Sequence, residues 1–174
     1  MQRTTGAAAL DRDAIEVQIR QAFAGVMLGS GISLRQAQVI DRFDDGVTDA
    51  DFDALPRAEV TNSWVDVPFD ELERDCVAHL DEDGLRYYLP ALLLSLLSHY
   101  DPASMRVVGT IAALRPHILS TERRFTYLTD EQHRAVADFL TALPRLLDLN
   151  KEDLKIVSTM VRDYWGRYAT SARI

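Results

Sequence analysis

The sequence has few of the residues and motifs on which enzymes and metalloproteins depend. Its one cysteine, Cys76, cannot form a disulfide within the chain and cannot build a structural zinc site alone. The four histidines are never three or four residues apart, so the common histidine spacings of zinc sites are missing. Neither a Gly-x-Ser-x-Gly elbow nor a glycine loop for phosphates or dinucleotides occurs. From these absences we predict no catalytic centre, no cofactor and no metal.

Long apolar runs are missing as well. The longest, residues 89–97, has nine residues and includes Pro90 and Ser95, whereas a membrane-spanning helix needs about twenty. Residues 1–10 contain too short an apolar segment for an export signal, and we interpret them as a flexible tail. Together with the single cysteine, these features predict a cytoplasmic protein that does not enter membranes.

Acidic side chains, by contrast, are abundant and concentrated in one part of the chain. Residues 41–83 contain fifteen acidic and three basic side chains, a local net charge of −12, while the rest carries +4 within a total of −8. A surface of this sign repels nucleic acids and attracts basic proteins. The charge map therefore predicts a basic protein partner and no nucleic acid. The alternative is that the acidic residues only keep the protein soluble.

The aspartates at positions 49, 51 and 53 alternate as they do at the start of a calcium-binding loop. Such a loop next requires a glycine, and then a glutamate at its twelfth position. Ala54 and Val60 occupy those two positions, and Pro56 interrupts the segment. We therefore do not interpret this stretch as a calcium site.

Helix-start signals recur along the chain, and no pair of strands is indicated. Capping boxes are predicted at Ser33 and Thr129, each with a glutamine three residues later. Thr48 with Asp51 is expected to start a short helical turn, and Asn150 is a plausible cap for the last helix. Residues 89–100 leave almost no polar face, which predicts a buried central helix. The fold class is all-α, with about seven helices around this segment in one domain spanning residues 11–174.

Three further helix starts are predicted from polar residues and prolines. Asp11 is expected to cap the first helix, and Asp66 with Pro68 to open a helix over 68–80. Asp101 with Pro102 is expected to open a helix that reaches about Leu114. Pro90 either kinks the central helix or marks a fresh start at Leu89. Residues 125–128 are expected to form an extended link.

Two groups of reactive or aromatic side chains have a structural interpretation. Cys76 lies on the predicted inner face of an acidic helix, where neighbouring carboxylates disfavour the thiolate, so we expect a buried, unreactive thiol. Tyr164, Trp165, Arg167 and Tyr168 continue an apolar stripe in the last helix. We expect that stripe to belong to the core, with a partner-facing aromatic patch as the alternative.

One block of the sequence resembles a known family. The segment Trp64-Val65-Asp66-Val67-Pro68 is followed by Gly84-Leu85-Arg86-Tyr87-Tyr88-Leu89-Pro90-Ala91. This pattern resembles a family of uncharacterised bacterial proteins in which Trp-x-Asp-Ile/Val-Pro precedes Arg-Tyr-Tyr-Leu-Pro-Ala. The similarity extends over roughly residues 11–143, although Leu85 replaces an expected phenylalanine. The family is a domain of unknown function, so the resemblance implies no catalytic residue.

The charge map favours a non-enzymatic, protein-binding function. Small acidic bacterial domains resemble, in general character, immunity proteins that neutralise toxins, so the most concrete version is an immunity protein that blocks a cognate toxin. Its acidic surface would be steered towards a basic cleft, with Phe52 as an apolar anchor. The candidate partner-binding residues are Asp44, Asp45, Asp49, Asp51, Phe52, Asp53, Asp70, Glu71 and Asp75.

Two alternatives remain open at this point. The first is an enzyme of unknown reaction, with Arg86 and Tyr87 binding an anionic substrate and Asp66 or His99 as base. Its structural alternative is that Arg86 pairs with Asp66 or another acidic neighbour. The second is a helical adaptor or homodimer that associates through residues 150–168.

Overall fold

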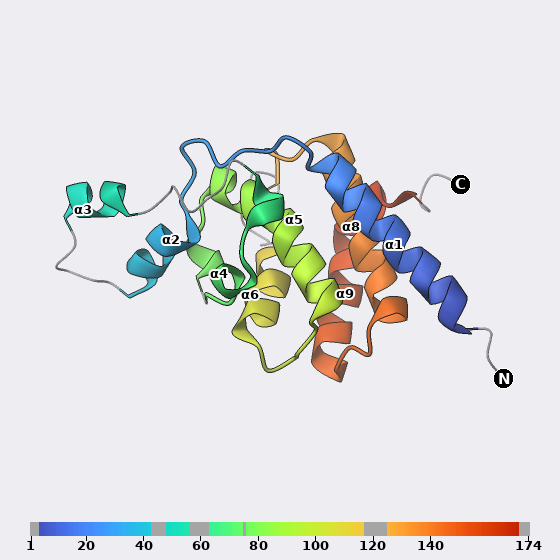
Figure 1. Ribbon diagram of the computed structural model, residues 1–174. Helices are drawn as coiled ribbons and strands as arrows, with labels where there is room; N and C mark the ends of the chain where they lie inside the picture. Colours follow the sequence, from blue (N-terminus) through green and yellow to red (C-terminus); the bar gives the residue numbers. More distant parts are fainter. Residues whose placement is uncertain (1–3, 43–47, 56–62, 75, 117–124, 171–174) are drawn as a thin grey trace.

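The computed structural model describes residues 4–42, 48–55, 63–74, 76–116 and 125–170, with side chains from residue 11 onward (Figure 1). These residues form helices and connections without a strand, which confirms the all-α prediction. The α-helices are α1 (Thr4–Ala22), α2 (Leu34–Asp41), α3 (Asp49–Ala54), α4 (Phe69–Leu72), α5 (Glu82–Ser98), α6 (Met105–Ala113), α8 (Asp130–Leu146) and α9 (Lys151–Asp163). Short 3-10 helices lie at η1 (Trp64–Asp66), η2 (Val77–His79) and η3 (Trp165–Tyr168).

Helix α5 is the centre of the molecule. It contacts α1, α4, α6, α8 and η1, and Figure 1 shows it running between the α2–α4 end and the pair α1 and α8. Its residues are almost all apolar, so burial on every side removes their surface from water and stabilises the fold. The largest fully buried side chains of the core are Ile19, Phe23, Leu34, Tyr87, Leu89, Leu92, Leu93, Leu96, Leu97, Phe125, Phe139 and Trp165.

The central helix is longer than the sequence predicted. It begins at Glu82, seven residues before the expected Leu89, because the Asp81 carboxylate accepts a hydrogen bond from the Gly84 amide at 2.9 Å and caps it. Pro90 lies inside this continuous helix, so no new helix starts there. A proline in this position leaves one carbonyl of the preceding turn without its helical partner.

Two contacts fix the approach of the chain to α5. The indole nitrogen of buried Trp64 donates to the Phe23 carbonyl at 2.8 Å, which attaches η1 to the end of α1. Near the start of α5, a Cβ on Gly31 would lie 2.6 Å from the Gly84 amide nitrogen, and one on Gly84 would collide with the Ile32 carbonyl. Glycine is therefore required at both positions, because the two backbone segments touch.

The structure confirms four of the predicted polar helix starts. Ser33, Thr48 and Thr129 each form a complete capping box at the starts of α2, α3 and α8. The Asn150 side chain accepts from the Asp153 amide at 2.7 Å and opens α9. Each of these contacts joins residues only three apart, so the local sequence contains everything they need.

Several other helix predictions were wrong. The first helix begins at Thr4 rather than at Asp11, because the strong helix formers at 7–10 extend it into the segment predicted as a tail. The expected helix over 68–80 is divided: α4 ends at Leu72, Cys76 has an extended φ of −148°, and η2 follows. Asp66 lies in η1, and α4 has no side-chain cap.

The connection before α6 and the one before α8 also differ from prediction. Asp101 accepts from the Ala103 amide at 2.9 Å in a turn, and α6 begins only at Met105. Around Phe125 the chain turns rather than extends, since the Leu128 amide donates to the Phe125 carbonyl at 3.0 Å. This turn brings the Phe125 ring into the core, 4.7 Å from the centre of the Trp165 ring.

Candidate functional site

The predicted partner-binding residues concentrate on α3, a short helix that stands apart from the body of the molecule (Figure 1). Asp49, Asp51 and Asp53 are all exposed there, and no residue of α3 is buried. Phe52 is half-buried, and its carbonyl accepts a hydrogen bond of 3.2 Å from the Gln36 side chain on α2. The described contacts therefore hold α3 by its backbone and leave its carboxylates facing solvent.

The negative charge on α3 is reinforced by its own capping box. Asp51 accepts hydrogen bonds from the Thr48 hydroxyl at 2.7 Å and from the Thr48 amide at 3.2 Å. These bonds lower the pKa of Asp51 and keep its carboxylate ionised. Neither Asp49 nor Asp53 forms an ion pair within the described ranges, so their charges are available to an incoming cation.

On α4 the predicted residues divide into two kinds. Asp70 is exposed, whereas the Glu71 carboxylate receives Arg35 at 2.9 Å and Arg74 at 2.8 Å. The hydrogen bond from Arg74, helped by Arg35, lowers the pKa of Glu71 to about 2. Glu71 therefore stabilises the junction of α2 and α4, and its charge is already compensated. Asp44, Asp45 and Asp75 lie outside the described residues.

A second ion pair attaches α4 to the body of the protein. The Arg106 guanidinium on α6, of which 2% of the side-chain surface is exposed, donates to Glu73 at 2.8 Å and to the His99 carbonyl at 2.8 Å. The same guanidinium lies 4.9 Å from the centre of the Phe69 ring. Sequence reasoning missed this contact, because the two partners are 33 positions apart and no local pattern joins them.

We next asked whether the acidic end, defined as residues 41–83, could bind a metal ion. Within the part of the chain that the structure describes, no three histidine, cysteine or acidic side chains gather closely enough to hold one. Cys76 is buried, as predicted, and its thiol donates to the Leu34 carbonyl at 3.1 Å. The exposed carboxylates of this end thus present separate charges rather than a cage of ligands.

The residues of the enzyme hypothesis do not form one site. Tyr87 and Tyr88 are buried with their rings edge to face, 4.9 Å between centres, and burial raises the pKa of Tyr88. His99 is exposed at the other end of α5 from Arg86, which at 1.5 Å per residue puts them roughly 20 Å apart. Asp66 is exposed on η1, and the predicted ion pair between Arg86 and Asp66 is not formed.

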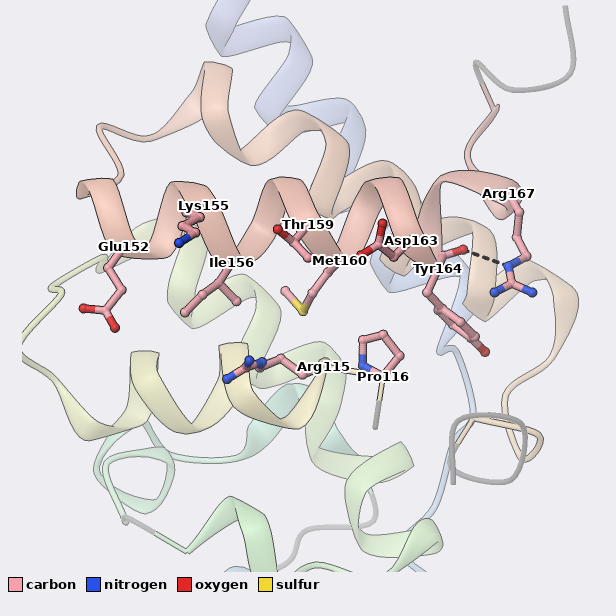
Figure 2. Close-up of a pocket in the computed structure, with 10 residues that line it drawn as sticks. All are labelled: Arg115, Pro116, Glu152, Lys155, Ile156, Thr159, Met160, Asp163, Tyr164 and Arg167. Carbon is pink, nitrogen blue, oxygen red and sulfur yellow. Dashed lines mark hydrogen bonds between the residues drawn. The ribbon is translucent and has the colours of Figure 1, made fainter. Parts of the chain in front are cut away.

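A groove of about 610 Å³ lies along α9 and the end of α6 (Figure 2). Ile156 and Met160 project from α9 towards Arg115 and Pro116, and they form an apolar floor. Charges of both signs surround that floor. The groove is lined by Arg115, Pro116, Glu152, Lys155, Ile156, Thr159, Met160, Asp163, Tyr164 and Arg167.

One end of this groove is formed by the aromatic stripe of the last helix. Trp165 is fully buried and donates to the Leu114 carbonyl at 2.9 Å, so it belongs to the core. The Arg167 guanidinium lies 4.4 Å from the centre of the Tyr164 ring and donates to the Tyr164 carbonyl at 2.9 Å. Burial raises the pKa of Tyr164, helped by a hydrogen bond with Tyr168, so its hydroxyl stays protonated.

The predicted dimer surface at residues 150–168 exposes little apolar side-chain area. Val157 and Trp165 face the core, and Leu154 alone among the larger apolar residues of this stretch is strongly exposed, at 40%. The spacing of Ile156 and Met160 could have signalled the groove, since residues four apart share a face of a helix. Its other wall comes from Arg115 and Pro116, which only the tertiary fold brings there.

No described helix has the length and apolar character needed to cross a membrane. Comparison with known proteins found no similar curated protein and no similar solved structure. A family model does match, over residues 11–169, which extends the similarity beyond the 11–143 block noticed in the sequence. The model describes a family of unknown function. The chain belongs to that family, DUF6714.

Proposed function

We propose that this chain is a non-enzymatic protein-binding domain that recognises a basic protein through its acidic end. The observation that carries the proposal is the exposed set of aspartates on α3, a helix that contributes nothing buried to the core. A helix without a packing role leaves its side chains free for recognition. In its most concrete form, the protein is a cytoplasmic immunity protein that binds a cognate toxin and blocks it.

The charges of the acidic end suit fast recognition. Asp49, Asp51, Asp53 and Asp70 are exposed, and the segment 41–83 carries a net charge of −12. Such a field accelerates encounter with a basic surface and orients the partner before contact. Because exposed charges are screened over about 8 Å at physiological salt, association should slow as salt rises.

Phe52 supplies the apolar part of the proposed contact. Phe52 stands between Asp51 and Asp53 in the sequence of α3 and is only half-buried, so a partner can cover its remaining surface. Aromatic side chains near the centre of an interface often contribute most of its binding energy. Glu71 is not part of the proposed contact set, since Arg35 and Arg74 already occupy its carboxylate.

The product of the adjacent gene is the first partner to test, because toxins and their immunity proteins are encoded together. The two purified proteins would be mixed at 50 mM and at 500 mM salt, and association and dissociation rates measured. The proposal predicts a complex whose association is at least about tenfold slower at high salt. A complex whose association rate does not change with salt would contradict electrostatic recognition. If no complex forms, the product of the adjacent gene is not the partner.

Blocking of activity is a separate test of the immunity version. If the partner is a toxin, a stoichiometric amount of this chain should abolish its activity in vitro and its growth inhibition in cells. A complex that leaves the toxin fully active would contradict the immunity version and leave a plain binding domain.

A further inference from the structure

We propose that Arg86 forms the centre of a binding site for a small oxyanion, a carboxylate or a phosphate. The site is a hollow of about 350 Å³ between the end of α1 and the start of α8. It shares no residue with the acidic end, so it stands independently of the function proposed above. Its size is at the lower end of the range for small-molecule pockets, which suits a small ligand.

The state of the Arg86 guanidinium points to a missing partner. Its Nε atom is buried without a hydrogen bond, and Arg86 forms no ion pair within the described ranges. The buried or half-buried Arg35, Arg74 and Arg106 each reach a carboxylate, although the Nη1 atom of Arg106 is also buried without a hydrogen bond. A guanidinium always carries its charge, so leaving a buried donor unpaired is costly, and an anion that displaces the atoms covering Nε would remove that cost.

The walls of the hollow are polar and held in place by the fold. Thr129, Glu131 and Gln132 come from the start of α8, and Gln21 from the end of α1. The Gln132 side chain donates to the Ala22 carbonyl at 3.2 Å, which joins the two helices across the floor. A second hollow of about 250 Å³ shares Gln21 and Glu131 with the first and adds Arg134. Arg134 does not line the hollow of Arg86.

Two electrostatic features determine which ligand fits beside Arg86: the positive end of α8 and the Glu131 carboxylate. The planar guanidinium can bind a carboxylate or phosphate through two parallel hydrogen bonds, and the positive end of the 17-residue helix α8 favours an anion there. Glu131 lines the same hollow and repels excess negative charge. A monoanion with a neighbouring hydrogen-bond donor, such as a hydroxy- or amino-carboxylate, therefore suits the site better than a dianionic phosphate.

The test follows the Nε–H resonance of Arg86 by ¹⁵N–¹H NMR, assigned by its disappearance in Arg86→Lys. Acetate, glycolate, glycine and inorganic phosphate are titrated separately at constant ionic strength. We expect a saturable shift with the carboxylates, stronger for glycolate or glycine than for acetate, and weaker binding of phosphate. Tighter binding of phosphate would still support an oxyanion site but would contradict the proposed repulsion by Glu131.

Variants distinguish the site from general charge effects. Amide shifts of residues 21–27 and 129–132, titrated with the same probes, should show binding weakened at least about tenfold in Arg86→Lys, since the bidentate fork is lost. Arg134→Lys in the adjoining hollow should bind within about twofold of the wild type. Urea unfolding confirms that both variants are folded. Absence of a saturable shift with all four probes, or unchanged binding in folded Arg86→Lys, would overturn the proposal.

Discussion

Helices α3 and α8 both begin with a capping box, but α8 packs into the core and α3 does not. Thr48 and Thr129 each close a complete capping box with the residue three positions later. Helix α8 then buries Val136, Phe139 and Leu140 completely, whereas α3 buries nothing. A capping box therefore determines where a helix starts, and only the packing of its apolar face determines how much it stabilises the protein.

This difference separates a scaffold from a recognition element. Residues of α1, α5 and α8 hold the fold together, and some of their polar side chains, such as Gln18, Gln132 and Asp138, form hydrogen bonds between distant parts of the chain. The aspartates of α3 serve no described long-range contact, and an isolated six-residue helix has little stability of its own. Substitutions in the two regions should consequently differ in what they change: folding in one, and binding in the other.

The largest expected difference concerns apolar truncation. Leu92→Ala would leave a cavity in the centre of α5, where the side chain is fully buried, and should lower the free energy of unfolding by about 3–4 kcal/mol. Phe52→Ala on α3 should cost less than about 1 kcal/mol, because that side chain is only partly buried and no residue of α3 is buried in the core. Urea unfolding of both variants measures the two values. Equal losses would show that α3 belongs to the core.

The ion pairs of Glu71 should give the next largest effect. Glu71→Gln removes the carboxylate that Arg35 and Arg74 share and should cost about 2–3 kcal/mol at pH 7. Asp70→Asn, at the exposed neighbouring position, should change stability by less than about 0.5 kcal/mol. Both values come from urea unfolding.

The stabilisation contributed by Glu71 should also decrease as the pH falls. Its pKa in the folded protein is about 2, against an ordinary value of 4.5, so its stabilisation is fully present above about pH 4.5. It is lost as the pH falls from 4.5 towards 2. The stability of the wild type should therefore approach that of Glu71→Gln over this interval. A difference that stays constant from pH 7 to pH 2.5 would contradict the assigned pKa.

The two capping boxes provide the smallest and most direct comparison. Thr129→Ala should lower the free energy of unfolding by about 1 kcal/mol, since it removes a cap from a packed helix. Thr48→Ala should leave the global value within about 0.5 kcal/mol and only accelerate amide exchange in α3. Hydrogen exchange with urea unfolding checks both outcomes. A global loss of 1 kcal/mol in Thr48→Ala would place α3 within the cooperative unit.

Sequence reasoning succeeded where the relevant contacts are local. The caps at Ser33, Thr48, Thr129 and Asn150 involve residues three positions apart, and the apolar run in α5 predicted its own burial. The candidate aspartates on α3 were also predicted to be accessible, and they are exposed. Their function as a binding surface remains a proposal.

Sequence reasoning failed where distant partners decide the structure. The predicted helix over 68–80 is divided, and the segment is held by contacts from Arg35 to Glu71 and from Arg106 to Glu73. No rule based on local sequence spacing predicts those long-range pairs. For the same reason, the pairing expected for Arg86 was wrong: α5 carries that side chain into the hollow beside α8 and not towards Asp66.

The central claim is that the acidic end binds the basic partner and that the rest of the molecule is the scaffold that holds the acidic end in place. Two triple variants with equal charge change test it: Asp49, Asp53 and Asp70 to Lys, and Asp13, Asp148 and Glu152 to Lys. All six residues are exposed, and Asp51 is kept so that the capping box of α3 survives. Each variant brings the net charge from −8 to −2, since every substitution adds two positive charges.

The decisive measurement is the affinity of both variants for the basic partner at low salt. The acidic-end variant should bind at least about a hundredfold more weakly than the wild type, mainly through slower association. The control variant should stay within about threefold of the wild type. Equal weakening of both variants would mean that only net charge matters, and an unchanged acidic-end variant would contradict the claim directly.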